Sequence, residues 1–566
     1  MYRLMPVACI ALVATSALAQ ETFVLPDDFQ TLQEVLNPAV SGIDPGDIIV
    51  LRDTVSYFGT FDVTVADLTI RAAAGDSPVL DANGAGSVLT VNIGNANLTL
   101  EGLTIEDGSG VGNGDRGCGI DVVNAGTLTI RNCVVQNNSS SNGGGLFARN
   151  TDIVIEDSTF RNNAAPNGGG LMAQDNGDIT LRRSTFRNNT ATSGNGGGVD
   201  IDLNNDRVIT IEECAFIENS CGNRGGACDL QDAAFLVITN SVFSLNTATQ
   251  STGDDGGALL IERIRNTTSI RGCEFNSNIA SDEGGAVLSL LGNNEFIEYV
   301  DNRIVGNEAS SGTIAVHGGS VDFVNCEFKG NTALRAGAGP NNGGAIKLNQ
   351  LNDNTRSFVR IINTIFDDNT AKRGGAIALD RRCDADVINS TFVNNAASIN
   401  GGAISAVDSG VNVRIHNCIF ASNLPATDQV NIATANGVED ASFNLFDSDG
   451  LIGQGSNNFF NTDPLFVDAA NGDYSIQPGS PAIDAGNTDF YRFGPLSDFG
   501  GNLRGQDDPD TFDAGVARIG PVIDMGAFEF TIAATGDGCS IDTNGDGAIN
   551  LADLNNILAA FGTLCP

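Results

Sequence analysis

Short runs of alternating apolar and polar residues recur along most of the chain. Residues 153–155 lead by such an alternation to Phe160, and residues 179–181 lead in the same way to Phe186. A period of two indicates strands that bury one face, whereas no repeated segment keeps helical spacing over enough residues to form a helix. The pattern therefore predicts two or three short strands in each repeat, without helices between them.

Two sequence markers give these strands a regular spacing. The motif Phe-x-x-Asn ends at Asn163, Asn189, Asn219, Asn246, Asn278, Asn331, Asn369, Asn395 and Asn423, with degenerate copies ending at Asn138 and Asn307. From Asn138 to Asn423, ten intervals span 285 residues, a mean of 28.5 per repeat. A Gly-Gly pair such as Gly225-Gly226 follows the motifs. Repeats of this kind bury their apolar face only by stacking on neighbours, so they predict a β-solenoid.

Each marker has a physical explanation. A Gly-Gly pair permits positive φ and a close approach of chains at a corner. The Asn of each motif tolerates a left-handed backbone, and its amide is placed to stack on the Asn of the next coil, about 4.8 Å away. The Phe residues are expected to form an interior column.

Most cysteines of the coils are expected to be small core residues. Five of them stand two residues before the motif: Cys133, Cys214, Cys273, Cys326 and Cys418. Cys221 and Cys228 flank a Gly-Gly pair, and the sequence does not decide whether these two cysteines form a disulfide.

The N-terminal segment and the net charge indicate an extracellular protein. Residues 1–19 combine Arg3, an apolar stretch and a small-x-small site ending at Ala19, which predicts a secretion signal. No other stretch approaches about 18 uninterrupted apolar residues, so we expect no transmembrane segment in the mature chain. The net charge of −40 disfavours nucleic acid and anionic membranes as partners. We expect a secreted, extracellular bacterial protein, with attachment to the cell surface left open, and a monomer.

The segments that flank the repeats predict caps. Residues 20–110 hold a short amphipathic helix at 29–36, the first strand from residue 48, and irregular first coils. Regular coils then occupy residues 111–462, and residues 463–530 form a closing segment, since a solenoid needs polar or helical caps. In the closing segment we expect a local polar network of five residues: Asp484, Asp498, Arg504, Asp524 and Glu529.

A calcium loop lies in the last module, residues 539–566, which follows a linker at residues 531–538. Twelve residues from Asp542 fit the spacing of an EF-type loop and predict Ca²⁺ as the cofactor. The expected ligands are the side chains of Asp542, Asn544, Asp546 and Asp553, the carbonyl of Ala548, and Asn550 directly or through water. A disulfide between Cys539 and Cys565 is the expected closure of a module with so little core.

These motifs resemble known families. Gly-Gly-Ala-Ile alternating with Phe-x-x-Asn, as around residues 343–369, resembles chlamydial polymorphic outer-membrane proteins and the wider pectin-lyase-like group. That resemblance implies an all-β, single-stranded right-handed parallel β-helix of about 11 or more coils. It says little about activity, because the group contains adhesins, lyases, glycosidases and epimerases. The last module resembles Gly-Cys-type dockerin-like anchors, which implies a cohesin-like or envelope docking partner, although one loop stands where dockerins normally hold two.

Four acidic residues are predicted to gather on one face. If residues alternate in and out after each Gly-Gly pair, then Asp200, Asp202, Asp229 and Glu262 come from three successive coils on the outer side. Carboxylates on coils about 4.8 Å apart raise one another's pKa or recruit a cation. Three interpretations remain: a solvated acidic surface, a Ca²⁺ site, or an acid–base pair for catalysis. The neighbouring cation Arg224 is not expected to be placed as a base, and His317 is expected at the surface.

Two functions fit this sequence. A secreted or cell-surface protein without catalysis would bind an extracellular polysaccharide or cell-surface glycan and be anchored by its calcium module. The alternative is an extracellular polysaccharide lyase or glycosidase, with the four acidic residues as the candidate catalytic groups. The uniform coils favour binding, because enzymes of this architecture usually interrupt the coils with long loops that wall a cleft.

Overall fold

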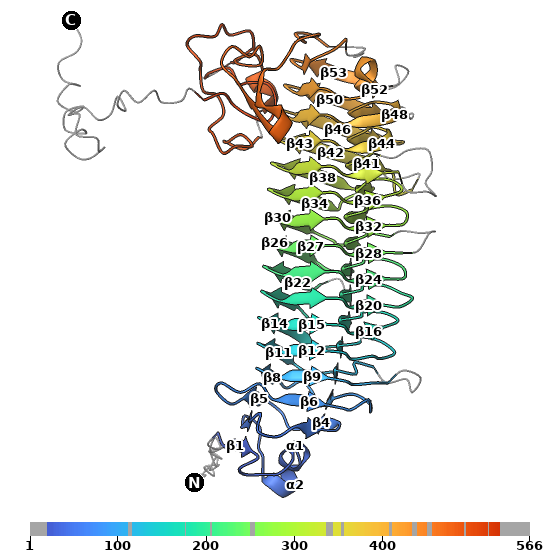
Figure 1. The fold of residues 1–566 in the computed structure, drawn as a ribbon, viewed down its shortest axis with the longest axis vertical. Helices are drawn as coiled ribbons and strands as arrows, with labels where there is room; N and C mark the ends of the chain where they lie inside the picture. The colour runs from blue at the N-terminus through green and yellow to red at the C-terminus, as the bar shows by residue number, and fades with distance from the viewer. Residues whose placement is uncertain are drawn as a thin grey trace, which may run out of the picture.

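A computed structural model describes residues 20–531, apart from 111–115, 176, 204–205, 250–254, 335–342, 353–355, 407–409, 433–437, 450–454, 492–493 and 519. The chain winds into one long stack of coils, with the first strand, β1 (Thr22–Leu25), near one end and the closing segment beside the other (Figure 1). Three long sheets run the length of the stack, and a fourth, shorter sheet lies at one corner. The 14 strands of one long sheet correspond to about 14 coils, somewhat more than the eleven counted from the motifs.

The coils contribute strands to the three long sheets in a fixed order, nine coils add a strand to the fourth sheet, and neighbouring strands within these four sheets are parallel. In one coil the order is β13 (Leu146–Arg149) in sheet C, β14 (Asp152–Glu156) in sheet A, β15 (Thr159–Arg161) in sheet B and β16 (Ala164–Ala165) in sheet D. The next coil begins with β17 (Leu171–Gln174), which pairs with β13 in register.

The strands of each sheet follow in chain order. Sheet A holds β1 (Thr22–Leu25), β2 (Ile48–Leu51), β5 (Leu68–Ala72), β8 (Leu98–Glu101), β11 (Thr127–Arg131), β14, β18 (Ile179–Arg182), β22 (Val208–Glu212), β26 (Phe235–Thr239), β30 (Thr267–Arg271), β34 (Phe296–Val300), β38 (Ser320–Val324), β42 (Ser357–Ile362), β46 (Cys383–Ile388), β50 (Asn412–His416) and β53 (Val438–Ser442). Sheet B holds β3 (Tyr57–Phe58), β6 (Val79–Asp81), β9 (Thr104–Glu106), β12 (Val134–Gln136), β15, β19 (Thr185–Arg187), β23 (Ala215–Ile217), β27 (Val242–Ser244), β31 (Glu274–Asn276), β35 (Arg303–Val305), β39 (Glu327–Lys329), β43 (Ile365–Asp367), β47 (Thr391–Val393), β51 (Ile419–Ala421) and β54 (Leu445–Phe446). Sheet C holds β4 (Phe61–Val63), β7 (Leu89–Val91), β10 (Ile120–Val123), β13, β17, β21 (Val199–Asp202), β25 (Cys228–Gln231), β29 (Leu259–Glu262), β33 (Val287–Leu290), β37 (Ile314–His317), β41 (Ile346–Asn349), β45 (Ile377–Leu379), β49 (Ile404–Ala406) and β52 (Val430–Ile432). Sheet D holds β16, β20 (Thr190–Ala191), β24 (Ser220–Cys221), β28 (Thr247–Ala248), β32 (Ile279–Ala280), β36 (Glu308–Ala309), β40 (Thr332–Ala333), β44 (Thr370–Arg373) and β48 (Ala396–Asn400).

Stacked Phe rings fill the interior as the motif predicts. Phe160, Phe186, Phe216, Phe243 and Phe275 stack with ring centroids 4.9–5.1 Å apart. The degenerate copy at Ile304 interrupts the column, which resumes from Phe328 to Phe446 at 4.7–4.9 Å. These spacings equal the distance between strands in a sheet, so each ring covers the one below it.

The Asn residues of the motif form a buried ladder, but their backbone is not left-handed. In each coil the amide Nδ2 donates to Oδ1 of the next Asn at 2.9–3.1 Å, and mostly also to a carbonyl in the coil below. The positive φ falls on the preceding residue instead, as at Asn162 (56°) and Asn188 (52°). The predicted stacking of the Asn amides is therefore confirmed, whereas the left-handed backbone occurs one residue before the ladder Asn.

The Gly-Gly corners have both properties that the sequence indicates. Gly225 has a φ of 68°, and a Cβ on Gly226 would lie 2.1 Å from the carbonyl oxygen of Gly257 in the next coil. The first glycine therefore turns the chain, and the second allows one coil to rest on another.

The cysteines of the coils are core residues. All nine described cysteines are buried, and Cys133 Sγ lies 3.2 Å from the carbonyl oxygen of Arg131, two residues before it. Cys221 packs with Ala191 and Ala248 in one cluster, whereas Cys228 belongs to the main core. Hence these two cysteines do not form a disulfide.

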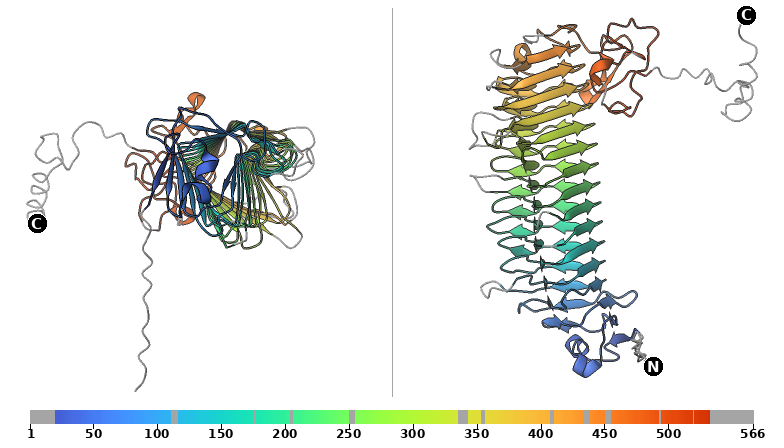
Figure 2. Two further views of the ribbon diagram at one scale, coloured as in Figure 1. Left: turned by 90° about the horizontal axis from the view of Figure 1, so that it is seen from below. Right: turned by 180° about the vertical axis from the view of Figure 1, so that it is seen from behind.

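Two short helices close the lower end of the stack (Figure 2, left). α1 (Leu32–Val35) is shorter than the predicted segment, and Thr31 caps its N-terminus through a capping box with Glu34. α2 (Pro38–Ser41) follows it. Leu32 and Val35 pack into the main core. The strand predicted to be the first, from residue 48, is β2. It is the second strand of its sheet, because β1 precedes it and pairs with it at the edge of the stack.

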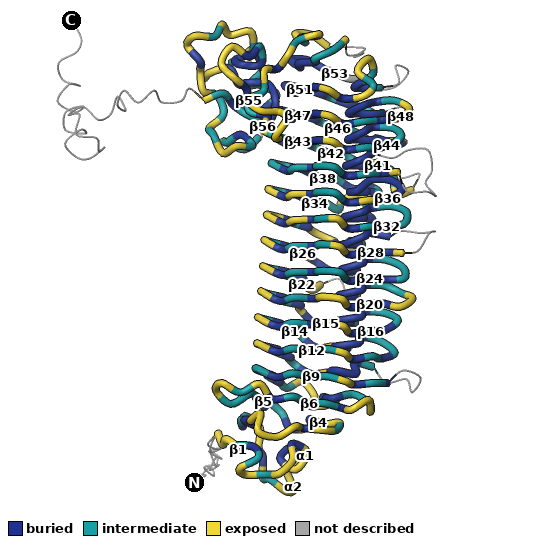
Figure 3. The backbone as a smooth tube through the Cα atoms, viewed as in Figure 1, coloured by how far each residue is buried: buried dark blue, intermediate teal, exposed yellow. Residues whose placement is uncertain are grey.

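The closing segment packs against the flank of the last coils (Figure 3). It contains the antiparallel pair β55 (Phe466–Asp468) and β56 (Asp473–Ile476) and the 3-10 turns η2 (Ala469–Asn471) and η3 (Thr488–Tyr491), while η1 (Ala426–Asp428) lies in the coils. Ile365 and Val393, on β43 and β47, are buried against Tyr474 and Ala527.

The predicted polar network of this segment is present. Arg504 Nη1 lies 3.1 Å from Glu529 Oε2, and the Glu529 amide donates to Asp498 Oδ2 at 2.7 Å. The Asp484 amide donates to Asp524 Oδ1 at 2.7 Å.

Across the described ranges, no helix is long and apolar enough to cross a membrane.

Candidate functional site

The predicted acidic residues lie in register on the outer side of sheet C. Asp200 on β21 pairs with Asp229 on β25, while Asp202 and Gln231 pair one position further along. Gln231 in turn pairs with Glu262 on β29. The alternation read from the sequence therefore brings these residues together from three successive coils.

This outer column is buried, contrary to the expectation of a solvated surface. Asp200 is 6% exposed and Asp229 is 0% exposed. The glycine corners that lead into each strand turn back across the sheet, so that a Cβ on Gly196 would lie 2.7 Å from Cα of Asp200. Only Asp202, at the end of its strand, is exposed.

Arg224, the neighbouring cation of the sequence analysis, reaches into the acidic group from the corner before β25. Its guanidinium lies 3.6 Å from Asp229 Oδ2 and 3.3 Å from Glu262 Oε2. The Gln231 amide donates to Asp229 Oδ1 at 2.7 Å. One cation thus joins carboxylates from two coils.

A second arginine completes the cluster. Arg263 binds both oxygens of Asp232 at 2.7 and 2.8 Å and donates to Gln231 Oε1 at 2.7 Å. It also contacts Glu262. Asp232 and Arg263 both have φ of 55° at the turn after their strands. The sequence prediction missed this pair because it considered only residues within the strands. Asp232 and Arg263 stand one position after the strand ends, where adjacent coils carry opposite charges.

Burial sets the protonation of the buried carboxyls. The pKa of Asp200 lies well above its usual range because of burial, with Asp229 and Asp202 adding repulsion against the attraction of Arg224. Burial likewise raises the pKa of Asp229 to about 7, opposed by Arg224 and the Gln231 hydrogen bond. Burial and Asp232 raise the pKa of Asp202.

The cavity at this cluster is small. Its volume is about 220 Å³, and its polar lining includes Asn167, Gln174, Asn195, Asp200, Asp202 and Arg224. Asp229 and Glu262 are not in its lining. A group that protonates a substrate must lie within hydrogen-bond reach of it, and Asp229 has no exposed surface.

His317 belongs to a separate polar group higher on sheet C, rather than to the open surface. Its Nε2 lies 2.6 Å from Glu283 Oε2, and Lys347 Nζ lies 2.5 Å from the other oxygen of Glu283. Lys347 is itself buried. Because its ammonium group is held in this ion pair, Lys347 does not serve as a base for the acidic cluster.

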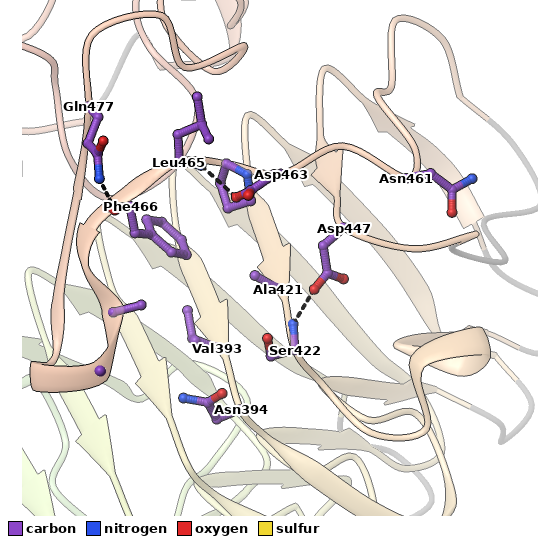
Figure 4. A pocket seen from close by; sticks show the side chains of 13 residues that line it. Val393, Asn394, Ala421, Ser422, Asp447, Asn461, Asp463, Leu465, Phe466 and Gln477 are labelled. Atoms are coloured by element: carbon purple, nitrogen blue, oxygen red, sulfur yellow. Dashed lines mark hydrogen bonds between the residues drawn. The ribbon is translucent and has the colours of Figure 1, made fainter.

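A larger cavity lies between the last coils and the closing segment, where the sequence predicted no site. We call it the terminal groove (Figure 4). Its volume is about 730 Å³, and its lining includes Val393, Asn394, Asn461, Asp463, Phe466 and Gln477. Side chains from β47 and β51 form its floor, and β55 forms one wall.

Hydrogen bonds and a ring contact hold the walls of the terminal groove. Asp447 Oδ2 accepts from the Ser422 amide at 2.6 Å, and Gln477 Nε2 donates to the Phe466 carbonyl at 2.6 Å. The Phe466 ring packs edge-on against Tyr474, with centroids 5.3 Å apart. The groove therefore combines a fixed aromatic ring with amide and carboxylate groups. The groove could not be predicted from the sequence because the coil strands and the closing-segment strand that form it are far apart in the chain.

The predicted calcium ligands Asp542, Asn544, Asp546, Ala548, Asn550 and Asp553, and the cysteines Cys539 and Cys565, lie outside the described residues, as does the predicted signal at 1–19.

Comparison with known proteins agrees with the coil architecture. The family model described as "Right handed beta helix region" matches residues 87–275. The fold is a right-handed parallel β-helix. Among solved structures, the crystal structure of pectate lyase Pel9A matches with 12% identity and a TM-score of 0.26, covering 87% of this chain and 90% of that one. A TM-score this low establishes no equivalent residues between the two chains. No curated protein matches the sequence.

Proposed function

We propose that this β-helix binds an extracellular polysaccharide or cell-surface glycan in the terminal groove, without catalysis. The observation that carries the proposal is the size and lining of the groove. Its volume of about 730 Å³ falls in the range of roughly 300–1,000 Å³ of ligand sites, whereas the 220 Å³ cavity at the acidic cluster falls below it.

The lining suits the chemistry of a sugar. Hydroxyl groups need donors and acceptors, which Asn394, Asp463 and Gln477 supply, and the C–H face of a sugar ring needs an apolar surface, which Phe466 supplies. Tyr474 holds the Phe466 ring from behind, so little side-chain freedom is lost when a ligand binds.

The test is a binding screen of the mature chain against neutral and acidic polysaccharides by calorimetry. We expect Phe466→Ala to weaken binding at least tenfold. Phe235→Ala is the matched control, because that ring is 44% exposed on sheet A and far along the chain from the groove. A lack of any binding in a broad panel, or equal binding by the two variants, would refute the proposal.

The acidic cluster favours a second candidate, an extracellular glycosidase or polysaccharide lyase. Asp200 lines the small cavity, and burial raises its pKa well above the usual range, which is the direction of shift that suits a carboxyl group to act as a general acid. Reducing or unsaturated ends released by the wild type and lost in Asp200→Asn would establish catalysis. Repeating the assay with EDTA would separate a metal-dependent lyase from a hydrolase.

The C-terminal module is proposed as a calcium-dependent anchor for an exported protein. Its support is the ligand spacing from Asp542 to Asp553. In the full chain, Asp546→Ala should abolish one Ca²⁺-binding event and any binding to a cohesin-like partner, whereas Asp537→Ala in the linker should not. Sequencing of the secreted protein should give Gln20 as its first residue, and a thiol count should show Cys539 and Cys565 oxidised.

A further inference from the structure

Three carboxylates converge in the closing segment, apart from both cavities. One oxygen each of Asp484, Asp507 and Asp513 lies within 4.8 Å of the other two. Asp507 and Asp513 come from one exposed loop, and Asp484 is 0% exposed beneath it.

The local backbone holds this arrangement in place. Asp484 has a φ of 48°, its amide donates to Asp524 at 2.7 Å, and its carbonyl accepts from Gly515 at 2.9 Å. Within the loop, Asp508 folds the chain back on itself, since its Oδ2 accepts from the Thr511 hydroxyl at 2.7 Å. Asp507 and Asp513 are thereby brought to the same side.

The buried carboxylate has an unused acceptor. Asp484 Oδ2 accepts from the Asp508 amide at 3.2 Å, but Oδ1 is buried and has no hydrogen-bond partner in the described part of the chain. A buried polar atom without a partner is destabilising, and more so when the group is charged. A second acidic group, Asp81 with Glu106 and Asp107, lacks this feature.

The charges around Asp484 are repulsive. Burial raises the pKa of Asp484 to about 6, the amide of Asp508 opposes this, and Asp507, Asp513 and Glu529 add further repulsion. The nearby Arg504 is engaged with Glu529 at 3.1 Å. A cation among the three carboxylates would offset this repulsion and give the unsatisfied oxygen a partner.

We propose that Asp484, Asp507 and Asp513 bind one Ca²⁺. Ca²⁺ takes 6–8 oxygen ligands at about 2.3–2.6 Å, so two of its ligands lie at most about 5 Å apart, which agrees with the 4.8 Å limit of this group. The donors are all carboxylates, which suits a hard cation rather than Zn²⁺. Backbone carbonyls or water would supply the remaining ligands.

Bound Ca²⁺ would tie the exposed loop to a buried residue of the closing segment. Asp484 belongs to the part that packs with Ile419 and Leu445 of the last coils, through its neighbours Ile483 and Ala485. The cation would therefore stabilise the closing segment on the flank of the β-helix, independently of the C-terminal calcium loop.

The experiment uses the full mature chain with Asp542→Ala and Asp546→Ala, so that the C-terminal loop cannot contribute. Calorimetry with CaCl₂ after chelation should show one site. Asp513→Asn should weaken it at least tenfold, and Ca²⁺ should raise the melting temperature of the parent but not of this variant.

The matched control is Asp510→Asn, which removes the same charge from an exposed position of the same loop outside the cluster. It should change the affinity less than twofold. Asp507→Asn provides a second ligand variant that is also exposed and should fold. A parent that binds no Ca²⁺, or equal affinities for Asp513→Asn and Asp510→Asn, would overturn the proposal.

Discussion

Asn189 Nδ2 lies 3.1 Å from Oδ1 of Asn219 in the next coil, and it also donates to the carbonyl of Phe160 in the coil below, at 2.9 Å. The Asn189 amide N–H donates to the same Oδ1 at 3.0 Å. One side chain therefore satisfies buried groups in three successive coils, and the coils depend on one another through it.

Asn219→Ala should destabilise the β-helix strongly. It removes the acceptor for two donors of Asn189 and the donor to the Phe186 carbonyl, all in a dry interior. With about 1–3 kcal/mol for each buried group left unsatisfied, we expect a loss of roughly 3–5 kcal/mol in urea unfolding. The control is Asn188→Gly, because Asn188 is exposed and its φ of 52° suits glycine. Equal losses in the two variants would contradict the ladder's role.

Gly226→Ala should cost more than an alanine at any open glycine. Its Cβ would lie 2.1 Å from the Gly257 carbonyl oxygen, so that two coils must separate. At Gly330, with φ of 61°, nothing lies within 4 Å, and Gly330→Ala should cost only about 1–2 kcal/mol from backbone strain. We expect about 3 kcal/mol or more for Gly226→Ala, measured as a shift in the unfolding midpoint. Similar midpoints would show that the coils can separate freely.

The repeat could be predicted because each feature is local and recurs. The Phe column and the positive φ at Gly225 depend on a residue and on its equivalent one coil away, so spacing alone reveals them. The register of Asp200 with Asp229 followed in the same way.

The rest depends on contacts that no repeat encodes. Burial of Asp229 follows from the path of the glycine corners, and its pairing with Arg224 follows from a corner side chain that turns back over the sheet. The terminal groove joins Val393 to Phe466 across distant segments. Such contacts are set by packing in three dimensions and leave no periodic signal.

The buried Asp229 should make stability fall as the pH rises. Burial raises its folded-state pKa from 3.8 to about 7, so below about pH 4 both states are protonated and no penalty exists. Between about pH 4 and 7 the folded chain keeps a proton that the unfolded chain has lost, and stability decreases. Asp229→Asn lacks this slope, so its free energy of unfolding relative to the wild type should increase across that window and then level off. Urea titrations from pH 4 to 8 measure it. Asp206→Asn, with a side chain 91% exposed, is the control, and parallel profiles would contradict the assignment.

Glu283 should have the opposite pH dependence. Burial opposes its ionisation, but the His317 hydrogen bond and Lys347 lower its pKa from 4.5 to about 2. Its contribution is therefore fully present above about pH 4.5 and is lost as the pH falls toward 2. At pH 6, Glu283→Gln should lose on the order of 3 kcal/mol in urea unfolding, since each pKa unit corresponds to about 1.4 kcal/mol. The gap between variant and wild type should close progressively below pH 4. A gap that stays constant down to pH 2.5 would mean that Lys347 and His317 do not hold this carboxylate in its charged form.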